Sequence, residues 1–95
     1  AYRPADAERE ELLKLLSEST IRSLDAETSR RLGYELQRTA TAITAGREAE
    51  ARGKEAEVRW AELCQDHALD IDPAAMRKLG HKLLKYSFTL LKAMP

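Results

Sequence analysis

Cysteine, aromatic residues and long apolar runs are all scarce in this chain of 95 residues, and these scarcities exclude several classes of protein. The single cysteine, Cys64, excludes an internal disulfide framework and fits a reducing compartment, so we expect a cytoplasmic protein. No apolar run approaches the length of a membrane span, and the N-terminal residues lack the apolar region of a secretory signal. We therefore expect no membrane partner.

Net charge is also absent, because 16 basic residues balance 16 acidic ones. The overall charge therefore predicts no particular partner. A chain of this length makes a single domain, residues 1–95, with a modest core. Hydrophobic residues at 43% and charged residues at 34% are typical of a heavily charged helical protein.

The sequence lacks the residue sets that carry out catalysis or hold a metal. It has no paired carboxylates in an apolar setting, no glycine-rich phosphate loop and no Ser/His/Asp set. Cys64 and His67 have Cys-x-x-His spacing, and His81 would supply a third zinc ligand. A structural zinc site usually has two paired clusters of ligands, however. We expect a protein that is not an enzyme and that uses no cofactor or metal.

Two helices are marked by local signals at their starts. Pro4 has the place of a first-turn proline, and the acidic residues after it suit the positive end of a helix dipole. A leucine cluster follows, which predicts a helix over residues 4–18. Asp72 caps, and Pro73 opens, a helix over residues 73–94. These two helices flank the middle of the chain.

The middle of the chain predicts one long helix over residues 25–67. Ser23 or Asp25 can cap it, and apolar residues recur on one side. It contains two glycines, Gly46 and Gly53, but three Glu-to-base pairs spaced four residues apart support a helix around them. Such a helix is about 65 Å long. A break at Gly46, which would give four helices, is the alternative.

Small residues form a stripe along this predicted long helix. At heptad spacing the stripe consists of Ala42, Gly46, Ala49, Gly53, Ala56 and Trp60. Small side chains let two helix axes approach closely, because backbone atoms can then touch. The two shorter helices cannot cover a helix of this length, so we expect the stripe to pack against the same stripe of a second chain in a homodimer. The alternative is that it packs under the protein's own C-terminal helix.

Charge is unevenly distributed along the chain. Residues 72–95 hold five basic residues and one acidic residue, whereas residues 23–71 hold seven basic and ten acidic ones. At 100° per residue, the basic residues of the last helix fall on one arc of about 140°, opposite an apolar side that includes Leu91. This basic face consists of Arg77, Lys78, His81, Lys82, Lys85 and Lys92.

A basic helical face suits several ligands: the phosphates of nucleic acid, an acidic protein, or a membrane surface. The last two helices can be drawn as a helix-turn-helix, although the linker is longer than the usual tight turn. A membrane-binding helix usually has more aromatic residues. The simplest explanation is that the lysines solvate the outer face of a core helix.

The segment GHKLLKYS, residues 80–87, resembles the site of histidine phosphotransfer domains, which expose a histidine near a lysine on a helical bundle. The resemblance implies a phosphorylated residue at His81. Those domains place a small residue just after the lysine, where this chain has Tyr86, and the spacing differs by one residue. The basic face explains His81 more simply, and phosphotransfer is the one enzymatic option.

Composition and pattern together predict an all-α protein, a helical bundle with one long central helix and two shorter flanking helices. The expected function is protein–protein interaction, as an adaptor, regulatory subunit or assembly factor. A homodimer through the small-residue stripe is expected, with the basic face presented to a ligand. The alternative is a dimeric nucleic-acid-binding regulator that uses the same basic face.

Overall fold

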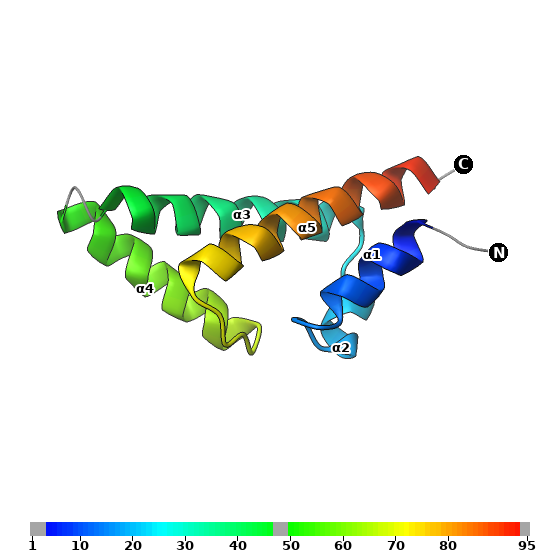
Figure 1. The fold of residues 1–95 in the computed structure, drawn as a ribbon, viewed down its shortest axis with the longest axis horizontal. Coiled ribbons are helices and arrows are strands. Elements are labelled where there is room, and N and C mark those ends of the chain that lie inside the picture. The colour runs from blue at the N-terminus through cyan, green and yellow to red at the C-terminus, as the bar shows by residue number, and fades with distance from the viewer. Residues whose placement is uncertain (1–3, 47–49, 94–95) are drawn as a thin grey trace.

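The computed structural model describes residues 4–46 and 50–93, which form five α-helices (Figure 1). They are α1 (Pro4–Leu12), α2 (Glu18–Arg22), α3 (Ala26–Gly46), α4 (Glu50–Asp66) and α5 (Pro73–Ala93). No strand occurs in these two ranges, so the prediction of an all-α protein is confirmed. The molecule is elongated, with extents of 50 × 22 × 17 Å.

The long helix α3 is central, and α4 and α5 both pack against it. α5 crosses α3 in the opposite chain direction, and α1 packs on α5 near both ends of the chain (Figure 1). Leucine and other apolar side chains from all five helices fill one core. Its buried members are Leu12, Leu16, Ile21, Leu24, Leu32, Leu36, Ala40, Leu63, Leu69, Met76, Leu79, Leu83 and Tyr86.

The predicted continuous helix over residues 25–67 is wrong, because this segment forms two helices. α3 ends at Gly46, α4 begins at Glu50, and α4 folds back against α3 (Figure 1). Residues 47–49 lie outside the described ranges. Folding back buries Ala56 and Leu63, which are 7% and 1% exposed and which a straight helix would hold away from the core. The break that the sequence left as an alternative at Gly46 is therefore close to the one observed.

The predicted helix over residues 4–18 also ends early, at Leu12. A turn follows, and Ser17 then caps α2 by accepting a hydrogen bond from the Thr20 amide at 3.2 Å. Leu16 and Ile21 are both buried. On one continuous helix they would lie about 140° apart, so only a turn lets both face the core.

α3 and α5 cross with their backbones in contact at Gly33 and Gly80. A Cβ atom at Gly33 would lie 2.8 Å from the carbonyl oxygen of Gly80, and one at Gly80 would lie 2.7 Å from the carbonyl oxygen of Gly33. Ser29 and Ser87, small and fully buried, belong to the same two helices. Close approach of two helix axes therefore does occur in this protein, but within one chain and at other glycines than those of the predicted stripe.

α4 ends in a Schellman motif at Ala68, the one non-glycine residue of the described ranges with positive φ, at 51°. The Leu69 amide donates to the carbonyl of Cys64 at 2.8 Å, and the Ala68 amide donates to Gln65 at 3.4 Å. The Trp60 indole N–H then donates to the Ile71 carbonyl at 3.2 Å. These bonds tie the loop between α4 and α5 to the end of α4.

Charged groups join α4 to α3 and cap α3. Arg59 pairs with Glu35 on α3 and with Glu62, and the hydrogen bond that it donates to the Glu35 carboxylate is the main cause of its raised pKa. Asp25 caps α3 by accepting from the Thr28 amide at 2.7 Å, which lowers the pKa of its carboxyl group. The stabilisation from this cap is present above the ordinary aspartate pKa and is lost as the pH falls through the lowered one.

Candidate partner-binding surface

A groove of about 760 Å³ separates the N-terminal half of α5 from α3. It exists because the two helices touch at Gly33 and Gly80 and diverge from that crossing toward the start of α5 (Figure 1). Residues from both helices line it. They are Gln37, Ala40 and Thr44 of α3, and Asp72, Pro73, Ala74, Arg77, Lys78, His81 and Lys82 at the start of α5.

Part of the predicted basic face lines this groove. Four of its six members, from Arg77 to Lys82, are brought together there. Lys85 is exposed on α5 beyond the groove. Lys92 lies near the other end of α5 and lines a second pocket, between α1, α2 and α5. The structure therefore divides the predicted face into a concave basic group and two outlying lysines.

The cations of the groove differ in how they are neutralised. Lys82 Nζ pairs with Glu11 Oε2 of α1 at 3.2 Å. Arg77, Lys78 and His81 have no ion pair with any described residue. The one carboxylate in the lining, that of Asp72, accepts from the Ala75 amide at 2.8 Å as the cap of α5. The groove therefore presents three basic side chains that form no ion pair within the described residues and can donate to an anionic group.

The floor of the groove is less polar than its rim. Ala40 of α3 is buried beneath it, and Pro73 is half-buried beside it. Gln37 and Thr44 supply an amide and a hydroxyl group at the α3 side. Short apolar contacts, amide hydrogen bonds and cations in one concave surface suit a polypeptide better than a small metal or phosphate ion.

The small-residue stripe is divided by the fold. Ala56 is buried in the protein's own core, and Trp60 packs partly buried against the same core. Ala42 is half-buried on α3. Gly46 and Gly53 belong to α3 and α4, and Ala49 lies outside the described residues. The homodimer was expected because a helix of about 65 Å would be left uncovered, and this fold contains no such helix among the described residues. Self-association itself stays a prediction.

The candidate zinc ligands are not assembled. In the described ranges no group of three His, Cys, Asp or Glu side chains is placed to hold a metal ion. Cys64 is half-buried, and burial is the main cause of the raised pKa of its thiol. Its Sγ lies 4.0 Å from the Ile71 carbonyl oxygen. Since the thiolate is the reactive and metal-binding form, these surroundings favour an inert structural cysteine.

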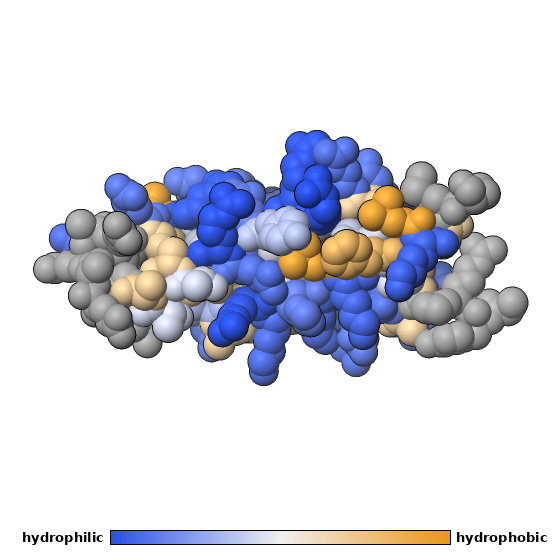
Figure 2. Space-filling model, turned by 90° about the horizontal axis from the view of Figure 1, so that it is seen from above, coloured by the Kyte–Doolittle hydropathy of each residue, from blue (hydrophilic) through white to orange (hydrophobic). Residues whose placement is uncertain are grey.

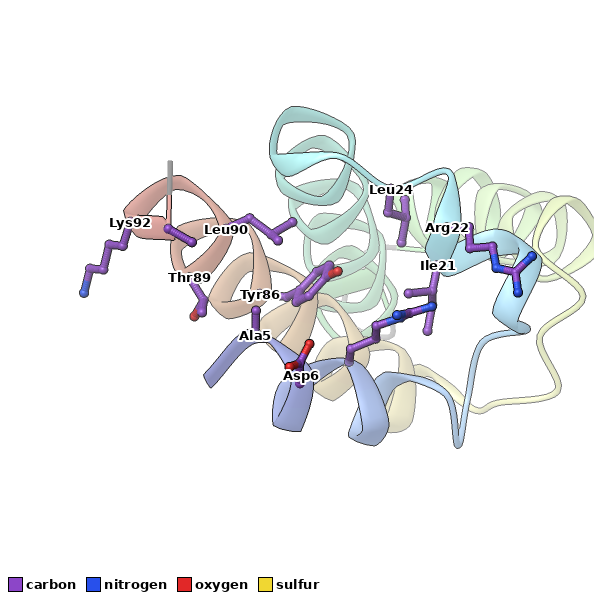
Figure 3. A pocket seen from close by; sticks show the side chains of 11 residues that line it. Ala5, Asp6, Ile21, Arg22, Leu24, Tyr86, Thr89, Leu90 and Lys92 are labelled. Carbon is purple, nitrogen blue, oxygen red and sulfur yellow. The ribbon is translucent and has the colours of Figure 1, made fainter. Parts of the chain in front are cut away.

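Sequence reasoning missed the second pocket, which has a volume of about 960 Å³. Figure 3 shows the Tyr86 ring between Ala5 of α1 and the side chains of Ile21 and Leu24. Arg9 and Arg22 lie at its edge, and both approach Glu18, at 3.9 and 3.0 Å. Three separate helices build this pocket, so no local sequence signal could have indicated it.

Comparisons with protein-family models, with curated proteins and with solved structures found no match for this chain. Across the described residues, no helix combines the length and the apolar character needed to cross a membrane.

Proposed function

We propose that this chain is a non-enzymatic protein–protein interaction module that docks an acidic segment of a partner protein in the groove between α3 and α5. The observation that carries the proposal is the gathering of Arg77, Lys78 and His81, without ion pairs among the described residues, in one concave surface. Lysines that only keep a helix face solvated are not expected to gather in a groove. An adaptor, a regulatory subunit or an assembly factor would use such a surface.

Electrostatics supports a short acidic segment as the ligand. A cleft lined by charges of one sign concentrates the field and speeds the encounter with a ligand of opposite charge. The positive end of the α5 dipole opens into the same groove at Pro73 and adds to the attraction. Gln37 offers hydrogen bonds to a peptide backbone, and the Thr44 hydroxyl, which donates to the Ala40 carbonyl at 3.3 Å, can still accept one.

Nucleic acid is the second candidate for the same groove, and two observations make it the weaker one. In a helix-turn-helix the two helices pack on each other, whereas here α4 and α5 each pack mainly on α3. Carboxylates also lie within the basic surface, since Asp72 lines the groove and Glu11 pairs with Lys82. A phosphate backbone would meet both positive and negative groups there.

The test is binding of a fluorescent glutamate-rich peptide, measured by anisotropy at several salt concentrations. The double variant Arg77→Glu/Lys78→Glu should weaken binding by about tenfold or more, because two attractions become repulsions. Lys82 is left unchanged, since it already pairs with Glu11. The matched control Lys14→Glu/Lys54→Glu reverses two exposed charges outside the groove and should change the dissociation constant less than twofold.

A duplex DNA of similar charge forms the second arm of the test. If DNA bound more tightly than the peptide, and if this affinity also depended on Arg77 and Lys78, nucleic acid would be the ligand of the groove. If the groove variant and the control variant changed the dissociation constants equally, both proposals would be wrong, because the groove would then not be the binding site.

Self-association is a separate part of the proposal, and we place it on the outer face of α3. A shallow hollow there is lined by Tyr34, Gln37, Arg38, Thr41, Ala42 and Ala45. Tyr34 is exposed, and the alanines are small enough for a second helix to approach closely. Ala42 is thus the member of the predicted stripe that supports a contact between two copies.

A further inference from the structure

The outer side of α5 changes from basic to apolar beyond the groove. Leu84, Phe88 and Leu91 follow one another at spacings of four and three residues, which places them on one side of the helix. Phe88 is 52% exposed and Leu91 is 49% exposed. Leu84 is half-buried and packs close to Gly33 of α3, where an added Cβ would lie 2.9 Å from the Leu84 Cγ. We name these three residues the α5 apolar strip.

The sequence groups Leu91 with the apolar side of the last helix, but in the structure this residue is exposed. α3 contacts α5 closely at Gly80 and Leu84, whereas Leu91, two turns beyond Leu84 on the same side of α5, is exposed. Figure 2 shows apolar side chains gathered on this upper face, over the C-terminal half of α5, with hydrophilic side chains around them. An apolar surface with a charged border is typical of a site for another protein.

The basic residues continue directly from the groove to this strip. At 100° per residue, His81 and Phe88 lie about 20° apart around α5, and Lys85 lies about 60° from Phe88. Lys92 is four residues beyond Phe88 on the same side. One continuous face of α5 therefore presents cations at its N-terminal half and apolar side chains, bordered by two lysines, at its C-terminal half.

A second copy of the same helix does not suit this face. Two α5 helices packed through Phe88 and Leu91 would bring Lys85 and Lys92 of one copy toward the lysines of the other, and like charges repel. A membrane surface is also a poor match, because Phe88 is the one aromatic side chain in the strip. The complementary ligand has apolar side chains together with carboxylates.

We infer that the partner segment is an acidic amphipathic helix that lies along α5, with its apolar side chains on Leu84, Phe88 and Leu91 and its carboxylates on the basic groove. This inference rests on the proposed function and specifies its ligand. A helix matches because apolar residues spaced by three and four positions repeat at the same distance as those of the strip. The face from Arg77 to Leu91 is about 21 Å long, so a partner helix of roughly 14 residues covers it.

The experiment uses two synthetic peptides of identical composition, each with an acidic half. In the first, three leucines lie on one helical face at positions i, i+4 and i+7; in the second, the same leucines are scattered. Titration calorimetry gives the dissociation constants, and circular dichroism reports helix formation on binding. The first peptide should bind at least tenfold more tightly than the second and should gain helix.

The variant Phe88→Ser/Leu91→Ser tests the strip, and Leu13→Ser/Val58→Ser is its control, since these two apolar side chains are exposed on other elements. The strip variant should lower the affinity for the first peptide at least tenfold and leave the second unchanged. The control should leave both unchanged. The charge variant Arg77→Glu/Lys78→Glu should lower the affinity for both peptides.

The outcomes separate this inference from the proposed function. Loss of binding in the charge variant, with none in the strip variant, would overturn the amphipathic helix and leave the acidic partner standing. No effect of the charge variant on either peptide would overturn the proposed function itself. A fall in solution mass on Phe88→Ser/Leu91→Ser, measured by light scattering, would show that a second copy occupies the strip and would overturn the inference.

Discussion

At the scale of single residues, the absence of a Cβ at two glycines allows α3 and α5 to approach closely. Gly33 and Gly80 face each other, and a Cβ added at either one would lie 2.8 or 2.7 Å from the carbonyl oxygen of the other. Both glycines were visible in the sequence, but neither was assigned a packing role. A glycine inside a helix indicates a cost in helix propensity, and only the position of the crossing helix shows what that cost allows.

We expect Gly33→Ala and Gly80→Ala each to lower the free energy of unfolding by about 1–3 kcal/mol, because the added methyl group must push backbone atoms apart. This loss outweighs the gain in helix propensity, about 1 kcal/mol. Urea unfolding followed by circular dichroism measures the change. Glu57→Ala, exposed on α4 and outside the proposed contact surfaces, is the control and should stay within about 0.5 kcal/mol of the wild type. If the glycine variants match this control, the two backbones do not touch.

At the scale of elements, helix ends follow local chemistry where a side chain or a proline supplies it. Asp25 and Asp72 both cap helices, as the sequence indicates. The end of α4 is different, because no glycine marks it and Ala68 takes the left-handed conformation. Leu69, the next residue, is buried in the core, and its burial holds the motif in place.

Ala68→Gly should raise the free energy of unfolding by about 1 kcal/mol, because glycine adopts positive φ without the steric cost that alanine has there. Thermal and urea unfolding measure the gain. Ala61→Gly, at an exposed position inside α4, is the matched control and should lower stability by about 1 kcal/mol. Equal destabilisation by both variants would show that residue 68 does not adopt the left-handed conformation in solution.

At the scale of the whole molecule, the return of α4 along α3 changes which surfaces are open to a partner. Ala56 and Trp60 of the small-residue stripe pack in or against the protein's own core. The surfaces that we propose for partners are instead the groove, the α5 apolar strip and the outer face of α3. The groove and the α5 apolar strip form one face of α5, and the hollow on α3 shares only Gln37 with the groove. Self-association and ligand binding can therefore be tested independently.

We expect light scattering to give a mass about twice the 10.7 kDa of one chain, through contact at the outer face of α3. Tyr34→Ser/Ala45→Glu should return it to one chain, because a carboxylate would then be desolvated in the contact. The groove variant Arg77→Glu/Lys78→Glu serves as the control and should keep the dimer. A wild-type mass of one chain would contradict self-association and leave the groove proposal intact.

The sequence by itself determined the helical class, the start of α5 at Asp72 and Pro73, and the gathering of basic residues on one side of that helix. These features depend on residues within one or two turns of each other, so hydrogen bonding and periodicity are sufficient to predict them. Only the tertiary structure decided that α4 folds back and that Gly33 meets Gly80. Those features depend on burial between residues far apart in the chain, where helix propensity differs by too little to choose between one helix and two.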